Sequence, residues 1–340
     1  MKKQFDVDIV ITWVDGADKN WLQEKNKYLD NEHQIDIDAS VKRYRDWDNL
    51  QYIFRGIEKF APWVHRVYLV TNGQVPKWLN TKNGKLVLVN HKDYIPAEYL
   101  PTFSARAIGL NMHHIQNLSE HFVYMNDDFF FLKPLKKNDF FDKNGLPKIV
   151  ALEKPNCVGN FIFDNNLMNN VRVLSKVFNK QQVKRQNKHK WYPINHPVCA
   201  LMNRVNDLVK GGWVGFYNDH LPSPLLKSGI EKCWELFGDD LHKTSLNKFR
   251  TIYDVNPFIF TDYLLCSGKF SPDKFGRKGK LFNLCDVENS NIQNCCELIK
   301  KQKHKMICLN DDIVKHFAET KKRINDALQL ILPEKSSFEI

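Results

Sequence analysis

Short apolar runs alternate with amphipathic segments over the first 135 residues of the chain. Residues 7–14, VDIVITWV, are β-branched and aromatic and end at the acidic turn 15–18, which predicts a strand followed by a loop. Over residues 46–60, apolar side chains recur every three or four positions. This spacing predicts an amphipathic helix that begins near an Asp cap and ends before Pro62.

Two further apolar runs, residues 66–71 and 85–90, predict strands that each end on polar residues. A helix is expected over about residues 104–118, and the run 121–125 then predicts another strand. That strand ends on Asn126-Asp127-Asp128, before a short apolar run. The alternation predicts an α/β fold with a Rossmann-like, mainly parallel sheet and flanking helices, in which ligands bind beyond the carboxyl ends of the strands.

The second half of the chain has a different pattern. From about residue 155 to 250 the periodicity is mostly helical, with Asn- and Lys-rich stretches such as 179–190 that we expect to be exposed loop or lid. A strand at 306–309 and an amphipathic helix over about 313–332 follow. These segments predict an α/β part at 1–150, a mostly helical insertion or cap at 151–250, and a return to the α/β core at 251–340.

Composition narrows the class of protein. With 340 residues, 43% of them hydrophobic, the chain can bury one large core, or a core with an inserted subdomain. The formal net charge of +11 favours anionic partners such as phosphates, nucleic acid or acidic lipid headgroups. Charged residues interrupt every apolar run well before the roughly 18 residues needed to span a bilayer, so we expect membrane contact to be peripheral.

The amino-terminal residues and the cysteines bear on the compartment. Residues 1–6 lack the apolar stretch and small-residue cleavage site of a secretory signal, so we expect an intracellular protein. The eight cysteines form no CxxC pair and no zinc-ribbon spacing, which favours reduced thiols. The adjacent pair Cys295-Cys296 is given no function.

Acidic turns are the first candidates for chemistry. Four of them follow strands or open helices: Asp15/Asp18, Asp46/Asp48, Asp127/Asp128 and Asp311/Asp312. Neighbouring carboxylates repel each other unless a cation neutralises them, and a hard divalent metal bound to a pyrophosphate would do so. For any single pair, closing a turn or capping a helix is the commoner role.

Other candidates are basic or aromatic. His220 lies in a polar turn ahead of a predicted helix, where it could act as an acid or base, although a lone loop histidine is usually only solvated. Arg250 could bind phosphate oxygens or form a surface ion pair. The basic residues 42–45 and Arg106 could position phosphate or start helices. Aromatic residues beside strands and turns more often complete a core than stack on a ligand, and three tryptophans are placed so: Trp13, Trp63 and Trp78.

Several motifs, in order, resemble the Stealth family. That family comprises bacterial capsular polysaccharide phosphotransferases and the catalytic subunit of the lysosomal N-acetylglucosamine-1-phosphotransferase. Residues 8–18 resemble the first signature block of the family. The second block is matched, in order, by Arg43, Asp46 and residues 55–64, 70–79, 100–104 and 124–128. The third and fourth blocks are similar to segments around residues 220–222, 248–250 and 307–312 and the Phe338-Glu339 end. Two departures are Asn49, where an acidic residue is common, and Asp15, where some members have Asn.

The resemblance implies transfer of hexose-1-phosphate from a UDP-sugar to a hydroxyl of an acceptor glycan, forming a phosphodiester and releasing UMP. It implies four catalytic residues: Asp127, Asp128, His220 and Arg250. A divalent cation, Mg²⁺ or Mn²⁺, is expected on Asp127, Asp128 and Asp311. The donor is expected to bind at Trp13, Asp15, Gly16, Arg43, Asp46, Asn72, Gln74, Ser104 and Asn310.

We expect residues 1–150 to bind the nucleotide-sugar and the insertion at 151–250 to carry the acceptor and catalytic loops; within it, residues up to about 210 carry no pattern of the family and are expected to hold acceptor specificity. The acceptor is an oligosaccharide or polysaccharide, free or lipid-linked. The expected location is the cytoplasm of a bacterium, with peripheral contact at the inner face of the membrane, and no nucleic-acid partner is expected.

Two rival hypotheses remain open at this point. A metal-dependent glycosyltransferase would also use a UDP-sugar and paired Asp residues, but it would attack the anomeric carbon and release UDP. A non-enzymatic basic protein that binds RNA or membranes is supported by the net charge of +11, but the chain carries no RNA-binding signature that we recognise.

Overall fold

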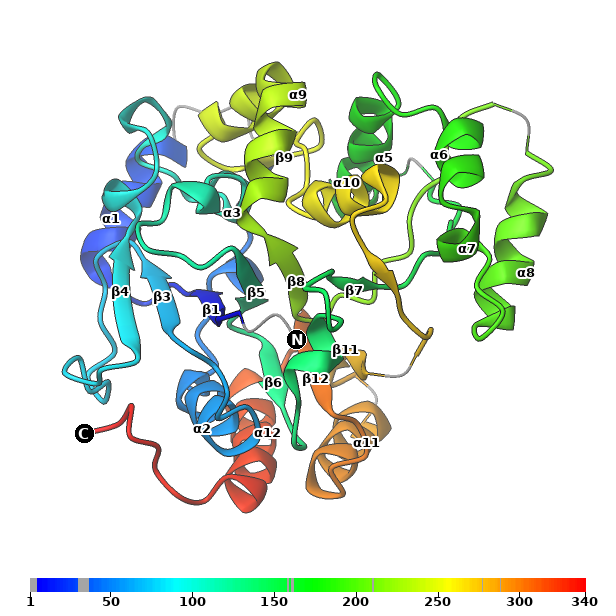
Figure 1. The fold of residues 1–340 in the computed structure, drawn as a ribbon. Coiled ribbons are helices and arrows are strands. Elements are labelled where there is room, and N and C mark those ends of the chain that lie inside the picture. The colour runs from blue at the N-terminus through cyan, green and yellow to red at the C-terminus, as the bar shows by residue number, and fades with distance from the viewer. Residues whose placement is uncertain are drawn as a thin grey trace.

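The computed structural model of the chain describes residues 5–29, 37–157, 159, 162–209, 211–276, 278–287 and 289–340. At its centre is a five-stranded sheet in the order β4-β3-β1-β5-β8 (Figure 1). The first four of these strands are parallel, and β8 joins the edge antiparallel to β5. Their bounds are β1 Val7–Thr12, β3 Val67–Thr71, β4 Leu86–Asn90, β5 His121–Asn126 and β8 Ser223–Leu226. The predicted α/β class with a mainly parallel sheet is confirmed.

The central strands are apolar because both faces of the sheet are covered. Val7, Ile9, Val10 and Ile11 of β1 are fully buried, and the apolar side chains of β3 and β5 are buried with them. The helices associated with this part are α1 Lys19–Leu29, α2 Leu50–Phe60, α3 Ala105–Leu110 and α9 Lys227–Leu246. Short 3₁₀ turns lie between them at Val41–Arg43, His91–Asp93, Ala97–Tyr99 and Met112–His114.

A second sheet lies beside the first, in the order β11-β12-β6. Its strands are β6 Phe129–Phe131, β11 Gly279–Cys285 and β12 Met306–Ile313, and the helices near it are α4 Lys137–Phe140, α11 Asn289–Lys300 and α12 Phe317–Ile331. The predicted helix start near residue 313 is wrong: β12 pairs with β11 as far as Ile313, so α12 begins only at Phe317.

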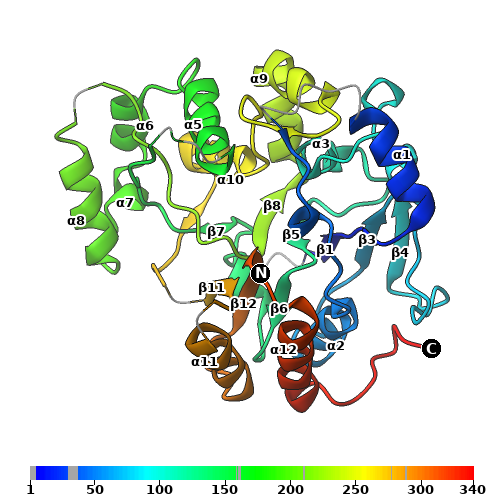
Figure 2. The same cartoon turned by 180° about the vertical axis from the view of Figure 1, so that it is seen from behind.

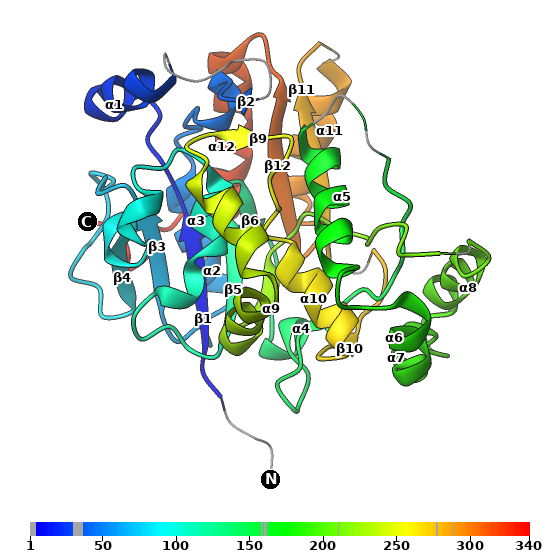
Figure 3. The ribbon, with the colours of Figure 1, turned by 90° about the horizontal axis from the view of Figure 1, so that it is seen from above.

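The predicted helical region contains helices and also one strand of the central sheet. Its helices are α5 Ile162–Leu174, α6 Lys180–Gln186, α7 Lys188–Trp191 and α8 Pro197–Asn206, and α10 Ile259–Ser267 packs against α5 and α6. In three views α6, α7 and α8 lie together at one edge of the molecule (Figure 1, Figure 2, Figure 3). Because β8 belongs to the central sheet, the range 151–250 is not all insertion.

The prediction of an exposed loop at 179–190 is wrong. Asn179 caps α6 by accepting a hydrogen bond from the Gln182 backbone N–H at 3.0 Å. Inside this segment Lys180 and Lys184 are buried, because each forms an ion pair with the buried carboxylate of Glu153. The Asn and Lys content that suggests a loop therefore belongs in part to a buried ionic cluster.

Other segments differ from prediction at their ends. The helix expected over 104–118 ends at Leu110 and continues only as a 3₁₀ turn, and α2 begins at Leu50 rather than near Asp46. Helix α1 was not predicted; its first turn is capped by Asp18, whose carboxylate accepts from the Trp21 N–H at 2.8 Å. Two short pairings complete the fold: β2 Ile37–Asp38 with β9 Arg250–Thr251, and β7 Lys148–Ile149 with β10 Ser271–Pro272.

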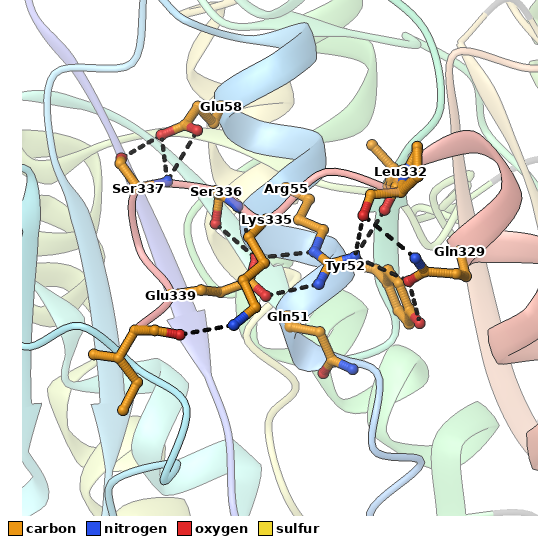
Figure 4. Close-up of polar contacts among 12 residues, drawn as sticks. Gln51, Tyr52, Arg55, Glu58, Gln329, Leu332, Lys335, Ser336, Ser337 and Glu339 are labelled. Carbon is orange, nitrogen blue, oxygen red and sulfur yellow. Dashed lines mark hydrogen bonds and ion pairs between the residues drawn. The ribbon is translucent and has the colours of Figure 1, made fainter.

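The carboxyl-terminal segment packs back onto α2, as Figure 4 shows. Arg55 binds both carboxylate oxygens of Glu339, at 2.9 and 2.8 Å. Between these contacts and the sheet, Phe338 is buried, with its ring 5.1 Å from that of Phe54. The Phe338-Glu339 end therefore belongs to the core.

Two predictions about composition can also be compared with the structure. All eight cysteines are free thiols. Trp13 is buried in the core, and Trp63 and Trp78 pack against it half-buried. Across the part of the chain that the structure describes, none of the helices has the length and hydropathy to cross a membrane.

Candidate active site

A cleft of about 520 Å³ opens at the carboxyl ends of β1 and β5. It lies where an open parallel sheet is expected to bind ligands. Among its lining are most of the residues predicted to act or bind: Trp13, Arg43, Asp46, Asp127, Asp128, His220, Arg250, Asn310 and Asp311.

The end of β5 and its pairing with β8 bring the acidic residues and His220 to this cleft. Asp127 and Asp128 form the two-residue link between β5 and β6, so they lie where the chain leaves the central sheet. Because β8 is antiparallel to β5, its first residue, Ser223, pairs with Tyr124 near the end of β5. His220 precedes that strand, and not directly a helix as predicted, so it lies at the same edge.

Two further pairings bring in segments distant in sequence. β12 runs antiparallel to β6, with Cys308 opposite Phe129 and the Leu309 N–H donating to the Asp128 carbonyl at 2.8 Å. β2 pairs with β9, which places Arg250 opposite Asp38. The cleft is thus built from parts of the chain that are far apart in sequence.

Asp128 lies at the centre of a small polar cluster. Carboxylate, imidazole and thiol atoms of Asp128, His220 and Cys308 lie within 4.8 Å of one another. The Cys308 thiol donates to Asp128 Oδ2 at 3.3 Å. Asp128 Oδ1 is buried and has no hydrogen-bond partner among the residues that the structure describes. Buried carboxylate oxygens normally have a hydrogen-bond or metal partner, so this atom is available to a ligand.

The two adjacent carboxyl groups are electrostatically strained. Burial raises the pKa of Asp127 well above its usual range, and the neighbouring Asp128 and Asp46 raise it further. Burial also raises the pKa of Asp128, against the opposing effects of Cys308 and Arg250. Without a cation, therefore, the pair resists carrying two negative charges.

His220 is enclosed by aromatic rings. Its imidazole lies 5.8 Å from the rings of Phe129 and Phe163 and 5.7 Å from that of Phe258, measured between centroids. Burial lowers the pKa of His220 to about 4, and Arg106 and Arg250 contribute in the same direction. The imidazole is therefore neutral at pH 7, and an anionic ligand beside the two arginines would be needed to raise its basicity.

Three guanidinium groups converge beside the acidic pair. Burial lowers the pKa of Arg106 to about 9, and Arg250 and Arg43 lower it further by charge repulsion. The pKa of Arg250 is lowered by burial and then by Arg43. Arg43 binds Asp38 at 2.5 Å, and both Nε and Nη2 of Arg106 donate to Asn166. Arg250 Nε is buried and unpartnered among the described residues.

The positive charges of Arg43, Arg106 and Arg250 repel one another, so a negatively charged ligand would stabilise this part of the cleft. Planar guanidinium groups match the oxygens of phosphate in geometry and charge. The cluster of Arg43, Arg106 and Arg250 is thus suited to an anionic, phosphate-like ligand. Tyr44 completes its wall, and burial raises the pKa of this phenol to about 12, so it stays a neutral donor.

The predicted metal ligand Asp311 has a partner in the protein. Arg45 donates to Asp311 Oδ2 from Nε at 2.8 Å, and to Oδ1 from Nη2 at 2.5 Å, while Trp47 Nε1 lies 3.2 Å from Oδ2. Asp311 would have to leave Arg45 to bind a cation. Its role as a metal ligand stays a prediction.

Five predicted donor-binding residues do not line the cleft: Asp15, Gly16, Asn72, Gln74 and Ser104. Asp15 exchanges two hydrogen bonds with the Gln74 side chain through its backbone, at 2.9 and 3.0 Å. A side chain at Gly16 would clash with the Tyr44 carbonyl oxygen, 1.9 Å from an added Cβ. Ser104 is buried and accepts from the Arg106 N–H. The contacts of Asp15 with Gln74, of Gly16 and of Ser104 therefore fix the conformation of the loops around the cleft.

The donor set decides which cation the cleft would suit. Carboxylates are the ligands that Mg²⁺ and Mn²⁺ prefer, whereas a thiolate would favour a softer metal. Burial and the charge of Asp128 raise the pKa of the Cys308 thiol well above its ordinary value, so it remains protonated and acts as a donor. The unpartnered Oδ1 of Asp128 beside Asp127 therefore fits a hard divalent cation better than zinc.

Sequence reasoning did not identify Cys308 as part of the site, nor Tyr44 as part of its wall. Cys308 is an apolar-strand residue by pattern, and only the pairing of β12 with β6 brings it to Asp128. A signal existed: Cys308 is two residues from Asn310, and alternate residues of a strand share a face.

Comparison with known proteins was made by sequence and by structure. Residues 5–33, 43–149 and 297–340 match Stealth protein conserved regions 1, 2 and 4, respectively. The third block predicted around His220 and Arg250 stays a prediction. The chain is 36% identical over 344 residues to the capsular polysaccharide phosphotransferase WcwK of Streptococcus pneumoniae, with 100% of this chain and 99% of the relative covered.

A second relative is the exopolysaccharide phosphotransferase cps2G of Lactiplantibacillus plantarum, 36% identical over 337 residues, with 98% of this chain and 96% of the relative covered. Among solved structures, the apo-form glycosyltransferase GlyE of Streptococcus pneumoniae TIGR4 has a TM-score of 0.39 at 9% identity, covering 99% of this chain and 65% of that one. That structural likeness is too weak to bear on function.

Proposed function

Since the chain belongs to the Stealth family, and relatives along its full length are named polysaccharide phosphotransferases, we propose that it transfers hexose-1-phosphate from a UDP-sugar to an acceptor glycan. The product is a phosphodiester in a capsular or cell-surface polysaccharide, and UMP is released. The chain is thus a phosphotransferase, and the donor and leaving group are the parts of the proposal that need a test.

One observation carries the proposal: two carboxyl groups without a cationic partner, Asp127 and Asp128, line the same cleft as three guanidinium groups, of which only Arg43 has a carboxylate partner among the described residues. A donor pyrophosphate together with a divalent cation would supply both missing charges. Neither a neutral sugar nor a nucleic-acid strand without a metal would do so. Perturbed titratable groups that converge in a cleft are typical of active sites.

We assign Asp127 and Asp128 as the ligands of the cation. When bound, a divalent cation would withdraw electron density from the phosphate oxygens and so favour attack at phosphorus. The two carboxylates would hold it at the end of β5, where the link between β5 and β6 is only two residues long. Arg43, Arg106 and Arg250 bind the non-bridging oxygens of the donor. Arg250, with its unpartnered Nε, steadies the charge that builds on the departing UMP.

His220 accepts the proton of the acceptor hydroxyl in this scheme, because its neutral imidazole lies within 4.8 Å of Asp128. The hydroxyl oxygen attacks the β-phosphorus in line, and the bond from that phosphorus to the bridging oxygen of UMP breaks. The bond between the anomeric carbon and its oxygen stays intact. The anomeric configuration of the sugar is therefore retained.

The parts of the chain divide the work in this proposal. Residues 1–150 hold the nucleotide-sugar, and within the insertion at 151–250 it is helix α5 that approaches the acceptor glycan. The α5 residues Ile162, Phe163 and Asp164 line the cleft and connect the two parts. The proposed setting is the cytoplasmic face of a bacterial membrane, where the protein meets a lipid-linked acceptor by peripheral contact.

The test is to incubate the protein with a panel of UDP-sugars, Mg²⁺ or Mn²⁺ and a polysaccharide acceptor, and to quantify UMP and UDP. UMP that rises with acceptor concentration supports phosphotransfer. UDP as the main product would instead show a glycosyltransferase, and no turnover of any UDP-hexose, together with binding that metal does not affect, would favour a non-enzymatic binding protein. Asp326→Asn, on the exposed surface of α12, is the matched control for Asp128→Asn.

A further inference from the structure

Helix α8, Pro197–Asn206, buries a mostly polar side and exposes its apolar side. Its buried positions are Cys199, Asn203 and Asn206, spaced on one side of the helix, and two of the three are amides. Its apolar side chains lie on the opposite side, in solvent. A surface helix of a globular protein normally buries its apolar stripe and exposes its polar one.

Hydrogen bonds fix α8 in this orientation. Asn203 accepts from the Glu153 N–H at 2.9 Å and donates to the carbonyls of Ala151 and Trp191, both at 2.8 Å. Asn206 donates to the Glu153 carbonyl at 2.7 Å. If the helix rotated to bury its apolar side, these amides and carbonyls would lose their partners inside the protein, at a cost for each. The exposed apolar side is therefore built into the fold.

The exposed side forms a contiguous surface, which we call the α8 patch. It covers α8 and the turn after it, and its members are Val198, Leu201, Met202, Val205, Leu208 and Val209. Leu201 is 64% exposed and Leu208 is 80% exposed. Ile194, on the turn before the helix, is 98% exposed. Clustered apolar exposure of this kind marks an interaction surface, unlike single exposed residues.

The charge around the α8 patch is one-sided. Residues 179–210 contain seven Lys or Arg residues and one acidic residue, Asp207; two of the seven, Lys180 and Lys184, are buried against Glu153 and do not reach the surface. The Asp207 carboxylate is already bound by Lys184, at 2.6 Å. Arg204 of α8, Lys188 of α7 and Arg185 of α6 are exposed. An occupant of this surface would therefore meet an apolar strip flanked by positive charge.

We propose that the α8 patch docks on the surface of a lipid bilayer that carries anionic headgroups. Helices of this type lie in the plane of the interface, with the apolar side among the acyl chains and basic residues on the headgroups. At 10 residues, α8 has three turns to lie flat and is too short to span the membrane. Helix α8 would thus make the peripheral membrane contact of the proposed function, on which this inference rests.

The position of α8 fits this occupant. The helix lies at the outer edge of the molecule with α6 and α7 beside it (Figure 1, Figure 3). The cleft is lined by α5 and by residues of the two sheets, with none of its lining from α8 among the described residues. Docking through the α8 patch therefore leaves the cleft accessible, and it would hold the enzyme where a lipid-linked acceptor is concentrated.

The test is cosedimentation of the full chain with vesicles of phosphatidylcholine alone or mixed with phosphatidylglycerol. We expect binding to the anionic vesicles, with a partition coefficient at least about tenfold lower for Leu201→Glu/Leu208→Glu and for Arg185→Gln/Lys188→Gln/Arg204→Gln. The matched control is Leu330→Glu, which replaces a leucine of α12 that is 65% exposed. All variants should keep wild-type circular dichroism and wild-type UMP release with a soluble acceptor.

Three results would overturn the proposal. The wild type could fail to bind either type of vesicle, or Leu330→Glu could lose as much binding as the double variant. Alternatively, light scattering could show a dimer that Leu201→Glu/Leu208→Glu dissociates, in which case a second copy of the chain covers the α8 patch. Failure of the proposed reaction would appear separately, as absence of UMP with the soluble acceptor.

Discussion

Arg45 binds both oxygens of the Asp311 carboxylate, at 2.8 and 2.5 Å, whereas Asp128 Oδ1 has no partner among the described residues. The acidic residues of the cleft thus differ in whether the protein supplies a cationic partner. Asp311 is already neutralised by a cation of the protein, but the pair formed by Asp127 and Asp128 is not. From this contrast we expect Asp127 and Asp128 to hold a ligand and Asp311 to hold the site together.

The first prediction compares these two carboxylates. Asp128→Asn should lower kcat at least about 10²-fold, because it removes charge that the cation needs. Asp311→Asn should raise KM for the donor about tenfold with a smaller effect on kcat, since it weakens charge-assisted hydrogen bonds to Arg45. Steady-state kinetics with varied Mn²⁺ distinguish the two. Loss of Mn²⁺ affinity in Asp311→Asn, equal to that in Asp128→Asn, would make Asp311 a metal ligand after all.

The second prediction concerns Arg250. Arg250→Ala should reduce kcat/KM by about 10³-fold, because an arginine at a transferring phosphoryl group contributes on that order. Arg250→Lys should recover little, since an ammonium group lacks the planar fork. Arg172→Ala, which changes an arginine with a side chain 58% exposed, is the control and should have wild-type kinetics. Full activity of Arg250→Ala would remove this residue from the site.

The third prediction concerns the Cys308 thiol. If it is a hydrogen-bond donor to Asp128 and not a metal ligand, Cys308→Ser should bind Mn²⁺ within about threefold of the wild type, because a hydroxyl preserves the donor. Cys308 should also resist iodoacetamide in the native protein, while the exposed Cys157 reacts. Mass spectrometry after alkylation measures this. Rapid native labelling of Cys308 would contradict its assignment as a buried, protonated thiol.

The fourth prediction concerns stability. Hydrogen bonds from Arg55, followed by one from the Ser336 N–H, hold the pKa of Glu339 below its ordinary value of 4.5. A carboxylate with a lowered pKa stabilises the folded state above the unfolded pKa, and this contribution is lost as the pH falls through the folded pKa. Glu339→Gln should therefore cost about 2 kcal/mol of unfolding free energy at pH 7, and the difference from wild type should shrink below about pH 4.5.

Urea unfolding at pH 7 and pH 3.5 measures this difference, and Glu319→Gln, an exposed change on α12, is its control. A difference between Glu339→Gln and wild type that stays constant down to pH 3.5 would show that the ion pair does not account for the effect.

Much of the fold was predictable because its strands are apolar and its turns are polar. The runs at 66–71 and 85–90 correspond to β3 and β4 within one residue, since buried parallel strands tolerate few polar side chains. Helix α1 was missed because its mean hydropathy is low and only Trp21 and Lys25 are buried. Local pattern cannot report burial that tertiary contacts decide.

The sequence indicated which residues form the site better than it indicated how they are brought together. Asp127, Asp128, His220 and Arg250 do line one cleft, although 122 positions of sequence separate Asp128 from Arg250. Antiparallel pairing of β8 with β5 and of β9 with β2 brings them together, and neither pairing has a local signal. For the same reason, the ion pair of Arg45 with Asp311 could not be foreseen.

The most direct test of the central claim follows the β-phosphorus of the donor. A UDP-sugar labelled with ³²P at the β-phosphate is incubated with the enzyme, Mg²⁺ and acceptor, and the label is located after separation of nucleotide and glycan. Attack at phosphorus predicts that the label enters the glycan in step with the release of unlabelled UMP, and that Asp128→Asn abolishes both. Label that stays in UDP while the sugar alone is transferred would contradict the account.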